Sequence, residues 1–283
     1  MGNFGLSWRP SRWPNGRFHD AKLGLASLFQ AICKPLYRTP QKVIGGIGNF
    51  LLPPRCLSCR QQTLQDNGLC PDCWRQLTPL TLCCQRCALP MAPELGGGAG
   101  DLLCGNCLTS PPPFCLTRSA LLYDDVSAQH IMAFKHGDRL DYAPWFARLL
   151  WQVGGQKLFD GADWIVPVPL HWTRQWRRRY NQAAELGKRV SKLSGVAVGH
   201  RLLKRRKATK SQGGLGMAAR QRNVAHAFQV PPKSKAQLAG KTVVLIDDVF
   251  TTGATARACS QVLLRAGAAE VRVLSIARVA RSA

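Results

Sequence analysis

Four pairs of cysteines in one short stretch constrain this chain more than any other feature. Each pair has the spacing C-x-x-C, and all four lie between residues 56 and 107 of the 283-residue chain. Two residues between thiolates allow both sulfurs to bind one tetrahedral zinc ion at about 2.3 Å. Disulfide frameworks seldom repeat that spacing four times. The pairs are Cys56 with Cys59, Cys70 with Cys73, Cys84 with Cys87, and Cys104 with Cys107.

Eight thiolates suit two structural zinc ions in a unit that is too short for an ordinary apolar core. We therefore predict a double zinc ribbon over residues 50–109. Sequential ligation, first pair with second and third with fourth, is favoured, while interleaved ligation and a competing Cys83 stay open. For the role of the ribbon, contact with nucleic acid and structural support have equal weight.

The remaining chain divides into an extension and a second domain. Residues 1–45 are basic and turn-rich, and we expect a poorly ordered extension there. The sequence "TSPPPF" at 109–114 marks a stiff boundary after the ribbon. From 115 to 283, short apolar runs alternate with helical patterns, which predicts an α/β fold: a mostly parallel sheet with helices on both faces.

The charge of the chain favours polyanionic partners. The net charge is +24, and residues 171–222 hold fifteen Lys or Arg but one acidic residue, Glu185. A field of this kind attracts nucleic acid, anionic lipid or phosphorylated small molecules. No convincing signal peptide is present, and no segment approaches the roughly 18 apolar residues of a transmembrane helix. Together with the thiol-rich ribbon, this predicts a cytoplasmic protein without a transmembrane segment.

The sequence "VVLIDDVFTTGAT" at 243–255 carries the most specific chemistry. It predicts a buried central strand, "TVVLI", with Asp247 and Asp248 at its carboxyl end, where open α/β sheets bind ligands. The next loop leads into a helix at about residue 254, so its N–H groups can bind a phosphate. The two carboxylates are suited to accept hydrogen bonds from the hydroxyls of a ribose whose 5-phosphate lies in the loop.

This stretch resembles the signature of type I phosphoribosyltransferases, which bind phosphoribosyl pyrophosphate (PRPP). The resemblance implies that Asp247 and Asp248 bind the ribose hydroxyls and that the following loop binds the 5-phosphate. Mg²⁺ is implied with the pyrophosphate. The loop residues are Thr251, Thr252, Gly253, Ala254 and Thr255.

The order of the other motifs resembles ComF/GntX-type proteins over about residues 50–280. After the cysteine pairs come "FKHGD" (134–138), "VPVPL" (166–170), "RRYNQ" (178–182), "KATKSQGGL" (207–215) and "RQRNVAHAF" (220–228). The resemblance implies a PRPP-binding domain behind a zinc ribbon, a role in competence or DNA utilisation, and single-stranded DNA as partner. It also implies contact with DNA-uptake machinery at the inner membrane.

The basic stretch after "VPVPL" gives further candidates for anion binding. In this fold the loop there binds pyrophosphate, so Arg174, Arg177 and Arg178 are candidates. Trp172 and Trp176 lie among these cations, which suits base stacking on single-stranded nucleic acid; anchoring of a helix on the sheet has equal weight. Residues 203–223 resemble the mobile loop that closes over such sites.

Two departures from the family pattern narrow the function. Arg179 stands where relatives often have glycine, which leaves the loop path undetermined. Thr251 stands where some purine-salvage enzymes have an aspartate that handles a proton, which disfavours purine-base transfer. Two alternatives to a PRPP- and DNA-binding competence factor stay open: an active phosphoribosyltransferase of nucleotide metabolism with an unknown acceptor, and a nucleic-acid-binding ribbon with a PRPP-sensing domain.

Overall fold

The structure is a computed structural model that describes residues 53–92, 102–136, 139–170, 180–206 and 226–280. All of these residues lie in one compact unit, Gly48–Ala283. The predicted extension over residues 1–45 lies outside the described residues.

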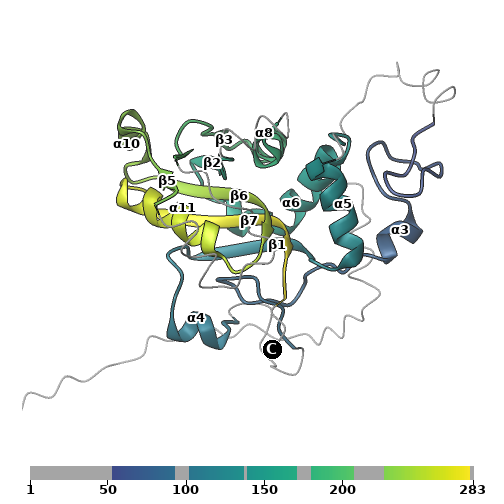
Figure 1. Cartoon of the computed structure of the whole chain (residues 1–283), viewed down its shortest axis with the longest axis horizontal. Coiled ribbons are helices and arrows are strands. Elements are labelled where there is room, and N and C mark those ends of the chain that lie inside the picture. Colours follow the sequence, from purple (N-terminus) through teal and green to yellow (C-terminus); the bar gives the residue numbers. More distant parts are fainter. Residues whose placement is uncertain (1–52, 93–101, 137–138, 171–179, 207–225, 281–283) are drawn as a thin grey trace, which may run out of the picture. The chain divides into compact units, whose positions relative to one another are not determined.

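A five-stranded parallel sheet forms the centre of this unit. Its strand order is β1-β7-β6-β2-β3, and every neighbouring pair is parallel. Figure 1 shows β7 between β1 and β6, so the strands that come first and last along the chain are neighbours in the sheet. The strands are β1 (Leu116–Leu122), β2 (Trp164–Pro167), β3 (Ala197–Val198), β6 (Thr242–Phe250) and β7 (Glu270–Arg278).

Helices cover both faces of the sheet. Alternate residues of β6 point to opposite faces, so Val244 and Ile246 join one apolar cluster while Val243 and Leu245 join the other. The first cluster includes side chains of α5 (Asp125–His136), α6 (Tyr142–Phe159) and α8 (Gln182–Ser194). The second includes side chains of α10 (Lys235–Leu238) and α11 (Ala254–Arg265). The predicted α/β fold is confirmed.

The remaining elements are short. Two of them begin directly after a ribbon cysteine, since Cys70 precedes α3 (Pro71–Arg75) and Cys104 precedes α4 (Gly105–Thr109). Strands β4 (Lys204–Arg205) and β5 (Phe228–Gln229) form an antiparallel pair, and the 3₁₀ helix η2 (Pro232–Ser234) leads into α10.

Strand β6 is longer than the sequence predicted. Asp247 and Asp248 were expected at its end, but pairing with β7 continues through Val249 opposite Ala277 and Phe250 opposite Arg278. The reason is that β7 itself extends to Arg278 and supplies partners for these residues. The two acids therefore lie within a paired strand, and strand pairing rather than a loop fixes their backbone.

The ribbon covers the outer edge of β1. Leu80 N donates to Ala120 O at 3.0 Å, and Leu122 N donates to Thr78 O at 2.8 Å. At the other end of the strand, Thr117 N donates to Gln85 O at 2.8 Å. An uncovered edge strand would expose unpaired N–H and C=O groups. The segment between the second and third cysteine pairs thus protects the sheet.

Candidate functional site

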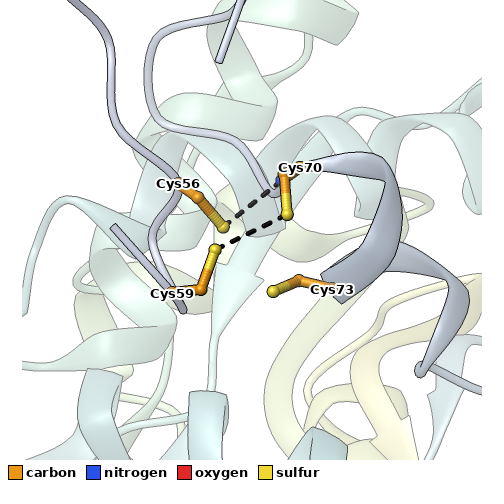
Figure 2. Close-up of side chains that lie close together, drawn as sticks. All are labelled: Cys56, Cys59, Cys70 and Cys73. Atoms are coloured by element: carbon orange, nitrogen blue, oxygen red, sulfur yellow. Dashed lines mark hydrogen bonds between the residues drawn. The ribbon is translucent and has the colours of Figure 1, made fainter. Parts of the chain in front are cut away.

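The structure brings the eight paired cysteines together in two groups of four. Within each group, the four Sγ atoms lie within 4.8 Å of one another. Figure 2 shows the four side chains of the first group pointing toward a common centre. The grouping joins first pair with second and third with fourth, as the sequence analysis favoured. The first group is Cys56, Cys59, Cys70 and Cys73; the second is Cys84, Cys87, Cys104 and Cys107.

One cysteine in each group lies where a thiolate is favoured, while burial raises the pKa of other members. Burial raises the pKa of Cys56, but backbone N–H groups, that of Cys70 first, outweigh it and lower the pKa to about 6. A hydrogen bond with Cys87 and backbone N–H groups lower the pKa of Cys84 to about 4. Cys70 N donates to Cys56 Sγ and Cys104 N donates to Cys84 Sγ, both at 3.3 Å. Four cysteine sulfurs gathered this closely, with one in each group accepting a backbone N–H, fit structural zinc.

The acid pair lies on β6, at the carboxyl half of the sheet. Burial, and after it the neighbouring Asp248 carboxylate, raise the pKa of Asp247 to about 7. Each carboxylate also accepts a backbone N–H, Asp247 from Asp248 N at 2.9 Å and Asp248 from Val249 N at 2.6 Å. Two acids this close repel each other, so a cation or a hydroxyl-rich ligand would stabilise the pair.

Lys135, in the "FKHGD" motif, is the partner of the acid pair. Its Nζ lies 3.0 Å from Oδ2 of Asp248, and both side chains are largely buried. Lys135 belongs to α5, far from the acids in sequence, so no local pattern indicates the pair. The ion pair partly neutralises the acids in the absence of a ligand.

The "RRYNQ" motif positions Lys135 and the start of α8. Tyr180 OH donates to Phe134 O at 2.6 Å, and Gln182 Nε2 donates to Lys135 O at 3.0 Å. Asn181 caps α8 by accepting from Ala183 N at 3.0 Å and donates through Nδ2 to Val168 O at 3.2 Å. The described part of this motif therefore joins the end of α5 to the end of β2.

Gly253 fixes the path of the loop after β6. Gly253 has φ +77°, and a Cβ there would lie 2.7 Å from the Phe250 ring. Another residue would therefore meet both backbone strain and a steric clash. Ala254 begins α11, a helix of 12 residues whose N-terminal N–H groups favour anions. Thr251, Thr252 and Thr255 add hydroxyl groups around this end.

The other predicted anion-binding residues lie outside the described part of the chain. They are Trp172, Arg174, Trp176, Arg177 and Arg178, together with most of the loop predicted over 203–223. Tyr180, the nearest described aromatic, packs against Phe134 with ring centroids 6.2 Å apart. It anchors the chain on the core. Among the described residues, no helix has the length and apolarity to cross a bilayer.

Two family models match the chain. One, described as a double zinc ribbon domain, matches residues 47–108, and the other, a phosphoribosyl transferase domain, matches residues 191–283. Among solved structures, an allosteric regulatory enzyme of purine biosynthesis aligns with 51% of this chain and 30% of its own. Its identity is 20% and its TM-score 0.33.

Several curated relatives match over nearly their whole length. DNA utilization protein YhgH of Salmonella typhi is 34% identical over 232 residues, which is 80% of this chain and 98% of the relative. Competence protein F of Haemophilus influenzae is 32% identical over 79% of this chain and 96% of its own. YhgH of Escherichia coli K12 is 32% identical, with coverages of 80% and 98%. The two four-cysteine groups and the ribbon match support structural zinc. The chain therefore belongs to the ComF/GntX family, with DNA utilization protein YhgH and Competence protein F.

Proposed function

We propose that this protein binds PRPP at the carboxyl half of its sheet and single-stranded DNA on its basic surface, and that it acts in the use of incoming DNA. The acid pair of β6, separated by two strand residues from a glycine-containing loop at a helix N-terminus, is the observation that carries the proposal. Asp247 and Asp248 accept hydrogen bonds from the ribose hydroxyls, and residues 251–255 bind the 5-phosphate.

The charges around the pair fit this assignment. Lys135 reduces the charge of the acids before ligand arrives, and its Nζ can then turn to an anionic oxygen of the ligand. Mg²⁺ supplies charge neutralisation for the pyrophosphate when bound. The arginines at 174, 177 and 178 are the proposed pyrophosphate partners from the sequence.

DNA as a second ligand rests on the charge and on the relatives. The net charge of +24 is concentrated at 171–222, and relatives are named for competence and for DNA utilisation. We place the working protein in the cytoplasm, where thiols stay reduced, in contact with the uptake machinery. Its parts are the extension 1–45, the ribbon 50–109 and the PRPP-binding domain 115–283.

Titration calorimetry with PRPP and Mg²⁺, and fluorescence anisotropy with labelled oligonucleotides, test the two ligands separately. We expect DNA affinity to fall steeply with salt, with log K dropping by about 0.7 per phosphate neutralised. Replacement of Arg177, Arg178 and Arg179 by alanine flattens that slope. If DNA binding is weak and the triple variant leaves it unchanged, the basic residues at 171–222 would serve PRPP binding alone.

Pyrophosphate release separates a binding protein from a transferase. The protein is incubated with PRPP and Mg²⁺, alone, with single-stranded DNA and with a panel of nucleobases. The proposal of a binding factor expects release no faster than the spontaneous rate. Release that depends on one acceptor would instead support the alternative of an active phosphoribosyltransferase, for which the same acid pair and loop provide the donor site.

A further inference from the structure

The last residue of β7, Arg278, links the second cysteine group to the loop after β6. We propose that Arg278 is a positioning residue that couples zinc at the second group to the phosphate loop, residues 251–255. PRPP affinity then depends on zinc at the second group and not on zinc at the first. This inference rests on the proposed PRPP site and adds its regulation by one of the two metals.

The side chain of Arg278 joins the two regions directly. Its Nε donates to Cys87 O at 2.8 Å, and one Nη donates to Thr251 O at 2.6 Å. The residue is only 2% exposed. Cys87 is a ligand of the second group, and Thr251 is the first residue of the phosphate loop. The guanidinium of Arg278 therefore contacts both the second cysteine group and the phosphate loop.

Aromatic packing turns this link into a constraint on the loop. The guanidinium lies over the Phe250 ring, 4.9 Å from its centroid. The same ring lies against Gly253, where an added Cβ would come within 2.7 Å of it. Phe114 packs edge-on against Phe250 with centroids 5.9 Å apart. A shift of Arg278 would thus displace both the carbonyl and the ring on which the loop rests.

Burial of the charge makes the coupling strong. A buried guanidinium is costly unless its donors find acceptors, and here Nε and one Nη donate to the backbone carbonyls of Cys87, Phe250, Thr251 and Val279. Without zinc the second group loses the bonds that fix its fold, and the Cys87 carbonyl moves away. Arg278 must then find another acceptor, which changes its contact with Thr251.

The first cysteine group has no such link among the described residues. It contacts α6 instead: Tyr142 OH donates to Leu57 O at 2.9 Å, and Arg148 donates to Asn67 O at 2.5 Å. A small cavity shows the same asymmetry, since residues of the second group and of the phosphate loop line it together. They include Cys87, Cys104, Cys107, Phe250, Thr252 and Arg278.

The test compares the full chain with two metal-site variants. Cys59→Ser with Cys73→Ser removes the first zinc, and Cys104→Ser with Cys107→Ser removes the second. We expect PRPP affinity, by calorimetry with Mg²⁺, to fall at least tenfold in the second variant and to stay within twofold in the first. Circular dichroism and thermal unfolding check that the sheet domain stays folded in both.

Linkage provides a readout besides affinity, because coupling between two sites is reciprocal. Zinc release to a colorimetric chelator is followed with and without PRPP, in each single-zinc variant. Ribose 5-phosphate serves as a second probe. It has no pyrophosphate group that could itself bind the released zinc. We expect either probe to slow release from the second group severalfold and to leave release from the first group unchanged.

Arg278→Lys keeps the charge but cannot bridge both carbonyls, and Arg278→Met removes the charge. Both should keep two zinc ions, bind PRPP about tenfold more weakly and lose the effect of PRPP on zinc release. If the methionine variant does not fold, the lysine variant decides. The proposal is overturned if the wild type binds PRPP but PRPP slows zinc release equally from both cysteine groups. It is also overturned if PRPP still slows zinc release from the second group in Arg278→Lys. No PRPP binding by the wild type overturns the proposed function as well.

Discussion

The two cysteine groups have the same four ligands and the same C-x-x-C spacing within each pair, but they pack against different parts of the sheet domain. The first lies against the helical layer, where Trp74 meets Trp145 edge-on at 6.4 Å and α6 side chains donate to ribbon carbonyls. The second lies against β1 and β7, where Thr117 Oγ1 donates to Arg86 O and Arg278 donates to Cys87 O. The same metal ligands are therefore used in two settings. The first group packs against helices, and the second is linked through Arg278 to the loop after β6.

Loss of zinc has the largest expected effect on both groups. Metal binding contributes about 10–16 kcal/mol in zinc-finger peptides, and so a ribbon this small needs the metal to fold. Protein purified without chelator should contain two zinc ions per chain, and Cys56→Ser or Cys70→Ser should contain one. Metal analysis and tryptophan fluorescence of the variants check this. Four oxidised cysteine pairs and no zinc would contradict it.

Replacement of the acid pair should affect PRPP binding without affecting zinc binding by either cysteine group. Asp247→Asn with Asp248→Asn should weaken PRPP binding at least a hundredfold, because each hydrogen bond to a charged group contributes about 1.5–3 kcal/mol. Zinc content should stay at two, since the partners of the two acids are backbone N–H groups of β6 and Lys135, which lie outside the cysteine groups. Calorimetry and metal analysis on the same sample decide. Unchanged PRPP affinity would refute the ribose assignment.

A glycine in each region gives a matched pair for the loop geometry. Gly253→Ala places a Cβ 2.7 Å from Phe250 at φ +77°, which should cost about 1–3 kcal/mol and lower PRPP affinity about tenfold. Gly105→Ala, within the second cysteine group, meets nothing within 4 Å and should change neither quantity. Urea unfolding and calorimetry measure both variants. If the two variants have the same stability and the same PRPP affinity, the loop after β6 tolerates a side chain at residue 253.

The difference in stability between the wild type and Asp247→Asn, followed across pH, reports on Asp247, because the pH dependence of zinc binding by the ribbon is common to both proteins. The pKa of Asp247 is raised to about 7 by burial and Asp248, so the folded state binds its proton more tightly than the unfolded state does. Stability from this group is present at about pH 4 and is lost as pH rises toward 7. Asp247→Asn should therefore stabilise the protein at pH 8 by about 1–3 kcal/mol, and little at pH 4.5, since one pKa unit is about 1.4 kcal/mol. Urea unfolding at both pH values checks the difference; a stabilisation independent of pH would contradict the assignment.

The smallest effect concerns docking of the first group. Tyr142→Phe removes the donation to Leu57 O and the 3.1 Å hydrogen bond with Nδ1 of His130, each worth about 1 kcal/mol. We expect a lower thermal midpoint and the same PRPP affinity, in contrast to Arg278→Lys. A loss of PRPP affinity in Tyr142→Phe would mean that both groups, and not one, are coupled to the ligand loop.

The sequence predicts what depends on local pattern. C-x-x-C spacing indicates the metal ligands because each pair is a local unit, and period and composition indicate the strands and helices. Gly253 was also visible, because a loop between strand and helix has a known shape. The contact of Lys135 with Asp248 and that of Arg278 with Cys87 were not, since they join residues 113 and 191 positions apart. Long side chains that cross between elements leave no periodic signal, and the end of β6 depended on its partner strand.

The pairing of β1 with β7 has a consequence for biosynthesis. The two strands are neighbours in the sheet, yet about 150 residues separate Leu122 from Glu270. At about 5–20 residues per second, a ribosome needs roughly 7–30 s to make that interval. During this time the ribbon, already emerged, is the partner within reach of β1 and covers its outer edge. The metal-bearing module thus precedes the ligand site in time as well as in sequence, and zinc supply during translation would limit how much of the nascent chain reaches a productive sheet.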